Sequence, residues 1–271
     1  MGVTLGFDPK RVYSALVLLP LLYVLTRHLP PVAFFVLITT TVLFAQWELL
    51  GLFFERRDLP RHALVVFPGA LLLLIAMQWP AALGFSLALS ITLVGLLCYQ
   101  IGFAPSGNGH PAMFIFLFGI LYVGYTFGHF LWLRNQHDGA LLVLFVLLVT
   151  WAGDAAAYYV GKTWGVWPLA PRLSPKKTIE GFLGGLIAAP LIAWIGHLWF
   201  LPAVTPVDCL ILGLLFTVLG LLGDLSESAL KRSAGVKDSG SLIPGHGGML
   251  DRIDSLLLNG PFFYYYMAFV R

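Results

Sequence analysis

Long apolar runs, separated by short segments rich in polar residues, glycine or proline, fill most of this 271-residue chain. A helix that crosses a bilayer needs about 20 predominantly apolar residues, with a range of about 17–25. Nine stretches meet this requirement, at about 11–27, 31–54, 62–78, 81–103, 111–133, 139–161, 180–200, 206–223 and 254–270. Backbone polar groups in lipid must find their partners within the segment, which favours helices. The pattern therefore predicts an all-α polytopic integral membrane protein with about nine transmembrane helices.

The ends of the first and the last two predicted helices are less sharply marked than the others. Lys10 and Arg11 precede the first apolar run, but no small-residue cleavage pattern follows it, so we interpret the run as an uncleaved first helix. We expect the segment that contains Asp224 to continue the eighth helix beyond the membrane edge. The last helix begins with Asp254 and contains Pro261, so its start is the least defined.

The amino-acid composition also indicates a membrane protein. Hydrophobic residues make up 59% of the chain and charged residues 11%, whereas a soluble domain is about 45–50% apolar and about 25% charged. Cys98 and Cys209 lie far apart in apolar runs, at no spacing typical of a metal site or a disulfide. We interpret both cysteines as packing residues.

Basic residues are distributed unevenly between the two sides of the predicted membrane protein. The N-terminal tail and the even-numbered loops carry nearly all of them. Only Arg27, Arg134 and Arg271, of the 16 lysines and arginines, fall on the opposite side. Because cytoplasmic loops carry an excess of Lys and Arg, the N-terminus is predicted to be cytoplasmic.

Two long polar segments, residues 161–180 and 224–254, fall on this cytoplasmic side. The other loops are short and carry few reactive groups. We therefore divide the chain into an N-terminal multi-span membrane region, residues 1–138, and a C-terminal membrane region, residues 139–271. The second region carries the candidate catalytic site, at the cytoplasmic edge of the membrane.

Two helix ends that flank the second polar segment each carry polar residues three and four apart, which share a helix face. The first set is Asp224, Glu227 and Ser228, and the second is Asp251, Asp254 and Ser255. Carboxylate oxygens are the ligands that hard cations such as Mg²⁺ prefer. Acids near membrane depth are costly and usually functional, although ion pairs with Lys231, Arg232 and Arg252 are the alternative role for them.

A turn rich in glycine lies between the two acidic faces. Its residues include Lys237 and Asp238, followed by the run Pro244-Gly245-His246-Gly247-Gly248. Glycine lets backbone N–H groups approach a phosphate closely, and a lysine neutralises its charge. Such a turn alone indicates little, but together with the flanking acids it favours a metal-bound polyphosphate. His246 either contacts phosphate or caps the turn.

The first polar segment contains Ser174-Pro175-Lys176-Lys177-Thr178-Ile179-Glu180-Gly181. Thr178 is predicted to cap the helix that follows, and the two lysines face either a bound anion or lipid headgroups. Two further acids lie inside predicted helices. Asp154 should face the protein interior or a watery cavity, and Glu48 is expected to pair with Arg56 or Arg57 at the membrane edge.

The spacing of these residues resembles the signature of phosphatidate cytidylyltransferases, also called CDP-diacylglycerol synthases. The matching positions are Ser228, Leu230, Lys231, Arg232, Lys237, Asp238, His246, Gly247, Gly248, Asp251, Arg252 and Asp254. Residues 151–158, 174–181 and 223–228 are similar to the family as well, so the resemblance covers roughly residues 150–260. Ala155 departs from the pattern, because the family usually has a hydroxyl residue there.

The resemblance implies that CTP and phosphatidic acid react to give CDP-diacylglycerol and pyrophosphate in phospholipid biosynthesis. It implies a bacterial inner-membrane protein, a site facing the cytoplasm, a homodimer, and no nucleic-acid partner. It also implies Mg²⁺, held by Asp224 and Asp251, with a second divalent or monovalent cation.

By position in the motifs, the implied catalytic residues are Asp224, Asp251, Lys237, Arg252 and Asp254. The implied substrate-binding residues are Ser174, Lys176, Lys177, Thr178, Glu180, Asp154, Glu227, Ser228, Lys231, Arg232, Asp238, His246, Gly247 and Gly248.

Three other functions remain open from the sequence. The first is a cytidylyltransferase or CTP-dependent kinase that acts on another lipid phosphate or on a polyprenol. The second is a membrane transporter, which intramembrane acids such as Asp154 and Asp224 would suit. The third is a catalytically silent scaffold, consistent with Ala155. The turn with Lys237, Asp238 and His246 argues against transport, which does not require it.

Overall fold

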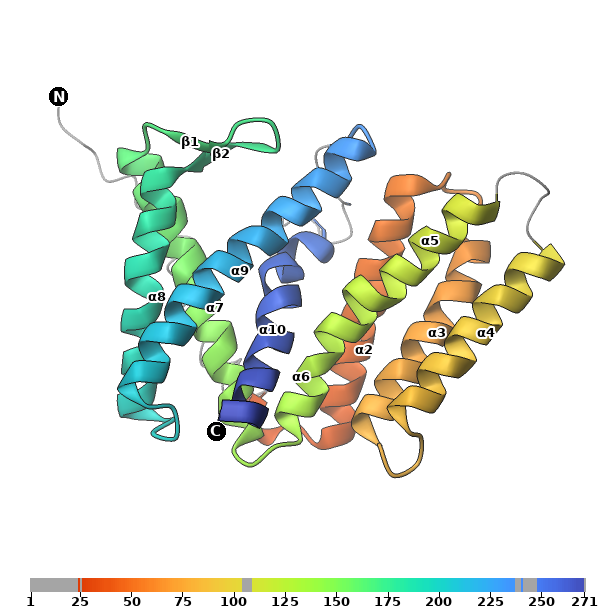
Figure 1. The fold of residues 1–271 in the computed structure, drawn as a ribbon, viewed down its shortest axis with the longest axis horizontal. Coiled ribbons are helices and arrows are strands. Elements are labelled where there is room, and N and C mark those ends of the chain that lie inside the picture. Colours follow the sequence, from red (N-terminus) through yellow and green to blue (C-terminus); the bar gives the residue numbers. More distant parts are fainter. Residues whose placement is uncertain (1–23, 25, 104–108, 237–239, 241–247, 271) are drawn as a thin grey trace.

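The computed structural model describes residues 24, 26–103, 109–236, 240 and 248–270. These residues form a bundle of long helices that run alternately up and down (Figure 1). The helices are α2 (Pro31–Phe53), α3 (Leu59–Gln78), α4 (Phe85–Phe103), α5 (Gly109–Gly119), the π-helical segment η1 (Ile120–Tyr125), α6 (Thr126–Arg134), α7 (Gly139–Trp164), α8 (Ile179–Trp199), α9 (Pro206–Ser233) and α10 (Leu250–Val270). The predicted all-α polytopic architecture is confirmed.

Within the described residues, seven helices are long and apolar enough to cross a membrane. One of them is the continuous rod formed by α5, η1 and α6, over Ala112–Arg134. Helix α10 is also long, but Asp251, Arg252 and Asp254 make its first turns polar. Most of the predicted first helix lies outside the described residues. The count of nine therefore stays a prediction.

The ends of α9 and α10 differ in how well the sequence locates them. Helix α9 continues past the apolar run to Ser233, as expected, and so carries Asp224. Helix α10 begins at Leu250, four residues before the predicted start at Asp254. Asp251 favours this earlier start, because a carboxylate in the first turn stabilises the positive end of the helix dipole.

The connections at one end of the bundle carry the polar segments. Residues 54–58, the chain between α7 and α8, and the C-terminal end of α9 all lie at the upper end in Figure 1. Residues 79–84, 135–138 and 200–205 connect helices at the lower end. This alternation agrees with the side assignment made from the basic residues.

Two short strands, β1 (Pro168–Ala170) and β2 (Ser174–Thr178), pair antiparallel at the upper end, with Pro168 opposite Thr178 and Ala170 opposite Ser174. The hairpin joins α7 to α8 and lies beside their upper ends (Figure 1). The sequence did not predict it, because residues 165–178 contain three prolines and no alternation of polar and apolar residues.

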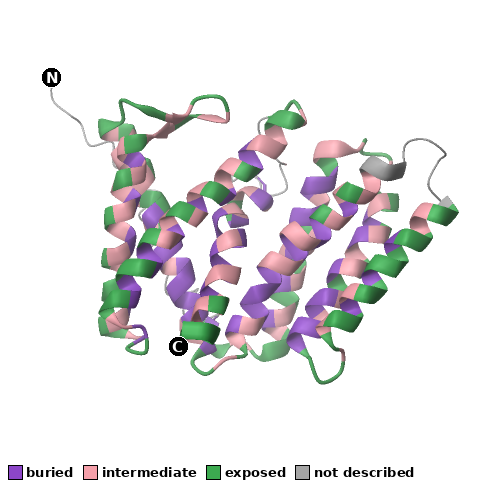
Figure 2. Ribbon diagram, viewed as in Figure 1, coloured by how far each residue is buried: buried purple, intermediate pink, exposed green. Residues whose placement is uncertain are grey.

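Buried residues concentrate where α2, α6, α7 and α10 face one another, while α4 and α8 are largely exposed (Figure 2). On α8 the exposed side chains form an apolar stripe of Leu183, Ile187, Leu191, Trp194 and Leu198, between 50% and 70% exposed. Their spacing of three and four residues places them on one helix face. Such a face is suited to lipid contact rather than to water.

Helices α9 and α10 approach each other most closely beside the acidic residues. A Cβ atom added at Gly223 would lie 2.3 Å from the carbonyl oxygen of Asp254, and one at Gly220 would lie 3.4 Å from Cβ of Ser255. Small residues allow helix backbones in membranes to come this near. The contact brings the acidic face of α9 against that of α10.

Candidate active site

Asp224 and Lys177 join helix α9 to strand β2 through an ion pair between Lys177 Nζ and Asp224 Oδ2. Ser228 lies one turn further along α9 and donates a hydrogen bond from Oγ to Asp224 Oδ1, at 3.4 Å. The two side chains of the ion pair are 25% and 35% exposed, so both remain accessible from outside. The predicted shared face of Asp224 and Ser228 is confirmed.

Lys231 connects the acids of α9 with those of α10. Its Nζ lies 2.5 Å from Asp251 Oδ1 and 3.4 Å from Glu227 Oε1. The other carboxylate oxygen of Asp251 accepts a hydrogen bond from the backbone N–H of Gly248, at 3.3 Å. Glu227 is only 1% exposed, and Lys231 is the cation that lies beside it.

Asp254 and Asp154 complete the group of acids. The backbone N–H of Ser255 donates to Asp254 Oδ1 at 2.7 Å, and Asp254 also interacts with Glu227 and Asp224. On α7, Asp154 lies near Ser255 and interacts electrostatically with Lys177 and Asp224. Three helices thus contribute to one carboxylate cluster, which consists of Asp154, Asp224, Glu227, Asp251 and Asp254.

The cluster suits a hard cation that a substrate helps to bind. Two lysines, Lys177 and Lys231, face its five carboxyl groups, so positive charge is in deficit if all five are ionised. No three acidic, His or Cys side chains in the part of the chain that the structure describes converge on a preformed metal site. Mg²⁺ characteristically takes one or two carboxylates and completes its shell with phosphate and water. The donor set therefore fits Mg²⁺ bound together with a polyphosphate.

The hairpin places its two lysines differently. Side chains alternate along a strand, and Lys177 points to Asp224 while Lys176 is exposed. Thr178 ends the strand and caps α8, because its Oγ1 accepts a hydrogen bond from Gly181 N at 3.1 Å. The predicted cap is confirmed.

Glu180 and Arg232, both predicted to bind substrate, make contacts that hold the hairpin. Both carboxylate oxygens of Glu180 accept from the backbone N–H of Trp167, at 3.2 and 3.3 Å. Arg232 donates from Nε to the carbonyl oxygen of Leu173 at 3.4 Å, and from Nη1 to that of Val236 at 3.2 Å. These contacts hold the hairpin against α8 and against the end of α9. Substrate binding by the two residues stays a prediction.

The remaining predicted site residues are distributed over β2, α10 and the segment before α10. Ser174 begins β2, and Arg252 lies exposed on α10. Gly248 is buried and donates to Asp251 as described above. Lys237, Asp238, His246 and Gly247 lie outside the described residues.

Two residues of the N-terminal region, whose neighbours the sequence did not indicate, lie near the start of α10 or beside the acids of the cluster. Glu48 accepts a hydrogen bond from Leu250 N at 2.9 Å. The expected pairing of Glu48 with Arg56 or Arg57 is replaced by this contact, and Arg57 instead pairs with Glu55 at 3.0 Å. The only feature of the sequence that could have pointed to Glu48 is that it is an acid within an apolar run.

Tyr122 is the second of these residues, and it lies on the π-helical segment η1. Its hydroxyl is buried and has no hydrogen-bond partner among the described residues. Glu227, Asp254 and Asp224 are its electrostatic neighbours. Single π-helical turns often mark functional sites, but nothing in the sequence around Tyr122 distinguishes it from other apolar runs.

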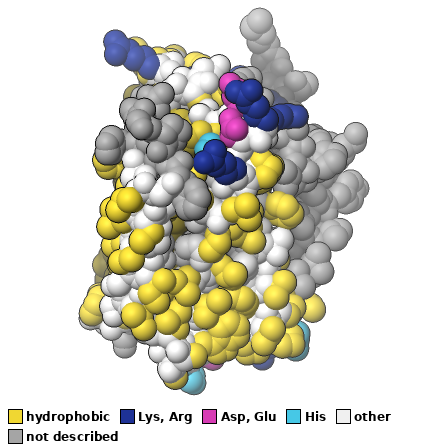
Figure 3. Space-filling model, turned by 90° about the vertical axis from the view of Figure 1, so that its right-hand side faces the viewer, with side chains coloured by type: hydrophobic (Ala, Val, Ile, Leu, Met, Phe, Trp, Pro, Cys, Tyr) yellow, Lys and Arg dark blue, Asp and Glu magenta, His cyan; other side chains and the backbone are white. Residues whose placement is uncertain are grey.

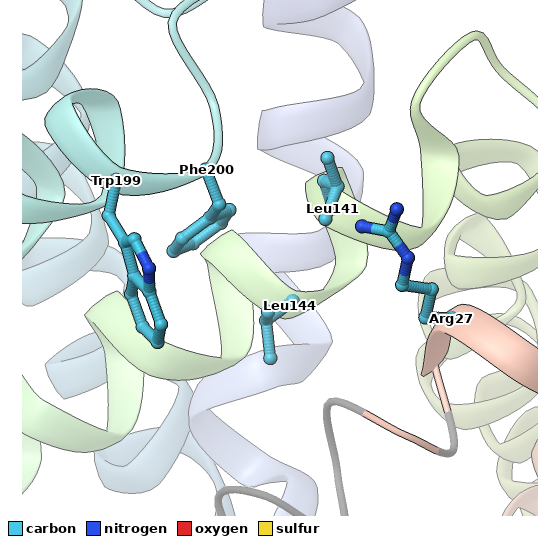
Figure 4. Close-up of a pocket in the computed structure, with 5 residues that line it drawn as sticks. All are labelled: Arg27, Leu141, Leu144, Trp199 and Phe200. Carbon is cyan, nitrogen blue, oxygen red and sulfur yellow. The ribbon is translucent and has the colours of Figure 1, made fainter.

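A cavity of about 310 Å³ lies at the opposite end of the bundle (Figure 4). Its lining residues are Arg27, Leu141, Leu144, Trp199 and Phe200. Four of these are apolar and none is a carboxylate, so the cavity lacks the ligands that a metal–nucleotide site requires. On the face of the molecule nearest α4, acidic and basic side chains lie near the upper edge, above hydrophobic flanks (Figure 3).

Fold and site together define a polytopic membrane protein with a carboxylate–lysine site at one end of its helix bundle. A model described as the cytidylyltransferase family matches residues 9–270. The chain therefore belongs to the cytidylyltransferase family, and it is a nucleotidyltransferase.

Three similar proteins match this chain over most of their length. A phosphatidate cytidylyltransferase of Bacillus subtilis (strain 168) is 38% identical over 227 residues, which cover 79% of this chain and 84% of the relative. A phosphatidate cytidylyltransferase of Staphylococcus haemolyticus (strain JCSC1435) is 37% identical over 229 residues, 81% of this chain and 86% of the relative. An uncharacterized protein of Escherichia coli (strain K12), YnbB, is 38% identical over 223 residues, 72% of this chain and 73% of the relative.

Proposed function

We propose that this protein transfers a cytidylyl group from CTP to phosphatidic acid, giving CDP-diacylglycerol and pyrophosphate. The observation that carries the proposal is the cluster of five carboxyl groups with Lys177 and Lys231 at one end of the bundle, in a chain of the cytidylyltransferase family. The relatives named phosphatidate cytidylyltransferase support the choice of lipid substrate.

The chemistry of the transfer agrees with the residues present. A phosphate oxygen of phosphatidic acid attacks the α-phosphorus of CTP, and the bond from that phosphorus to the oxygen bridging the β-phosphate breaks. Pyrophosphate leaves with the bond electrons. Because the nucleophile is already an anion, the step needs no strong general base. The difficulty is to bring two anions together, which positioned positive charges overcome.

We propose that Asp224 and Asp251 bind Mg²⁺, with a second divalent or monovalent cation beside it. When bound, magnesium neutralises and orients phosphate oxygens. Lys177 and Lys231 already contact these two aspartates, so they are positioned to bind phosphate as the cation arrives. Asp254 is proposed either to be a further metal ligand or to orient the ligands Asp224 and Asp251. Lys237 and Arg252 are proposed to stabilise the charge on the phosphates, and Lys176 to attract them.

We also propose that the site faces the cytoplasm from the bacterial inner membrane. The basic residues predict this side, and CTP is a water-soluble nucleotide of the cytoplasm. A site at the end of the bundle lets the nucleotide enter from water while the lipid headgroup enters from the bilayer. The homodimer that the family resemblance suggests stays a prediction.

The test uses purified protein in lipid nanodiscs with CTP labelled at either the α- or the γ-phosphorus. Cytidylyl transfer puts the α-label into the lipid product, whereas a CTP-dependent kinase puts the γ-label there. We expect lipid-bound α-label with phosphatidic acid, in the presence of Mg²⁺, and little product with a polyprenol or another lipid phosphate. Product formed only with one of these other acceptors would reject the proposed lipid substrate.

A further inference from the structure

Glu48 lies on helix α2, far from the residues of the signature, and yet it contacts the start of α10. Its side chain is buried, with the residue only 3% exposed. Carboxylate oxygen Oε2 accepts a hydrogen bond from the backbone N–H of Leu250 at 2.9 Å, although the two residues are 202 positions apart in the sequence. Glu48 thus links the N-terminal region directly to the helix that carries Asp251 and Asp254.

The contact satisfies a backbone group that the helix itself cannot satisfy. Leu250 is the first residue of α10, and the first N–H groups of an α-helix have no partner within the helix. Leu250 is fully buried, so water is a poor substitute for a partner. A carboxylate is well suited to this place, because it accepts a strong hydrogen bond and interacts favourably with the helix dipole.

The same carboxylate touches a second part of the polar segment. A Cβ atom added at Gly240 would lie 2.8 Å from Glu48 Oε1 and 3.0 Å from Glu48 Cδ. Only a glycine allows the backbone to pack so closely against the carboxylate. Glu48 therefore lies close to Gly240, in the segment between α9 and α10, and hydrogen-bonds Leu250, the first residue of α10.

The position of Leu250 determines where the acids of α10 point. Asp251 follows Leu250 directly, and its two oxygens are held by Lys231 and by the N–H of Gly248. Asp254 lies one turn further along the same helix. If the first turn of α10 unwinds or shifts, both carboxylates move relative to α9.

We propose that Glu48 is a positioning residue for cytidylyl transfer, which fixes the first turn of α10 and so holds Asp251 and Asp254 in place against α9. The effect on turnover rests on the proposed function. The effect on the structure of α10 does not, and it is measured separately.

The test compares Glu48→Ala and Glu48→Gln with Gln46→Ala, in the full chain in nanodiscs. Gln46 is a matched control, because it is also a buried polar residue of α2, and its Nε2 donates to the carbonyl oxygen of Gly119 at 3.2 Å, away from α10. Hydrogen exchange is followed in the peptide that contains Leu250, and kcat and KM for CTP are measured in parallel.

For Glu48→Ala we expect faster exchange at Leu250 and a loss of kcat, each at least about tenfold, because a charged hydrogen bond is removed. For Glu48→Gln we expect values between those of Glu48→Ala and the unaltered protein, since the amide oxygen can still accept from Leu250. Gln46→Ala should leave both measurements within about twofold of the unaltered protein, because buried groups at separate sites act independently.

Three results would overturn the proposal. The first is unchanged kcat in Glu48→Ala, whether or not exchange at Leu250 rises. The second is a loss of kcat without faster exchange. The third is an equal loss of kcat in Gln46→Ala, which would indicate general damage to α2.

If Glu48→Ala fails to insert, Glu48→Asp replaces it. The aspartate side chain is one methylene group shorter, so its carboxylate reaches Leu250 less well. The same expected and contrary outcomes apply to it. Should the unaltered protein transfer no cytidylyl group, the proposed function fails, whereas the exchange measurement still decides whether Glu48 holds the start of α10.

Discussion

Lys177 of strand β2 and Asp224 of helix α9 form an ion pair that connects the hairpin to the helix bundle. The pair joins the hairpin that follows α7 to the acidic face shared by α9 and α10. Both partners remain partly exposed, so a nucleotide phosphate can reach Lys177 and a cation can reach Asp224. The relationship therefore links the two polar segments that the sequence places on one side of the membrane.

Replacing Lys177 by Ala should lower kcat/KM for CTP by about 10²-fold, because a positioned charge that stabilises the transferring phosphate is worth about this much. Arg172→Ala is the matched control, since Arg172 is an exposed cation of the same hairpin. Steady-state kinetics in nanodiscs measure both variants. Equal effects of the two substitutions would show that only the overall positive charge of the hairpin matters.

Asp224→Asn and Asp251→Asn should each reduce turnover by at least about 10²-fold while the protein still inserts and folds, because each removes a charge that the proposed Mg²⁺ requires. Their Mg²⁺ dependence should also shift to higher concentrations. Labelled-CTP assays across a magnesium series, with size-exclusion profiles to monitor folding, measure both effects. Near-normal activity in either variant would remove that residue from the proposed metal site.

Gly223→Ala should destabilise the packing of α9 on α10, since the added Cβ would overlap the carbonyl oxygen of Asp254 at 2.3 Å. Overpacking of this kind costs about 1–3 kcal/mol. Gly95→Ala on α4 is the control, because nothing lies within 4 Å of a Cβ placed there. Thermal unfolding in detergent compares the variants, and equal melting temperatures would contradict the close contact between the two helices.

Thr205→Ala should lower stability by about 1 kcal/mol, the usual value of an N-cap, and should leave kcat unchanged. Thr205 and Asp208 form a capping box at the start of α9, with Asp208 Oδ2 accepting from Thr205 N at 2.7 Å. This cap lies at the end of α9 opposite to Asp224. A large loss of turnover, in protein shown to be folded, would mean that the start of α9 also serves the site.

The helices could be predicted from the sequence because length, apolar content and proline or glycine breaks all indicate the same segments. Helix α2, expected at 31–54, is Pro31–Phe53, and the cap of α8 at Thr178 follows from a local signal. The start of α10 could not be located in this way. Its first N–H is satisfied by Glu48, and a hydrogen bond between residues 202 positions apart leaves no local trace.

The site could be predicted as a set of residue types, but not as a set of contacts. Spacing alone puts Asp224 and Ser228 on one face, and the structure confirms it. The pairing of Lys177 with Asp224 depends on a hairpin that the sequence did not indicate. The sequence did not indicate that Glu180 accepts from Trp167 N, because the same hairpin brings that N–H to the start of α8; substrate binding by Glu180 stays a prediction.

The most direct test of the central claim is the fate of the two phosphorus labels of CTP, measured with purified protein, phosphatidic acid and Mg²⁺. The account predicts that the α-label appears in CDP-diacylglycerol, that the γ-label is released in pyrophosphate, and that chelation of magnesium stops both. Absence of α-label from the lipid with magnesium present, or its transfer by the Asp224→Asn variant at the full rate, would contradict the account.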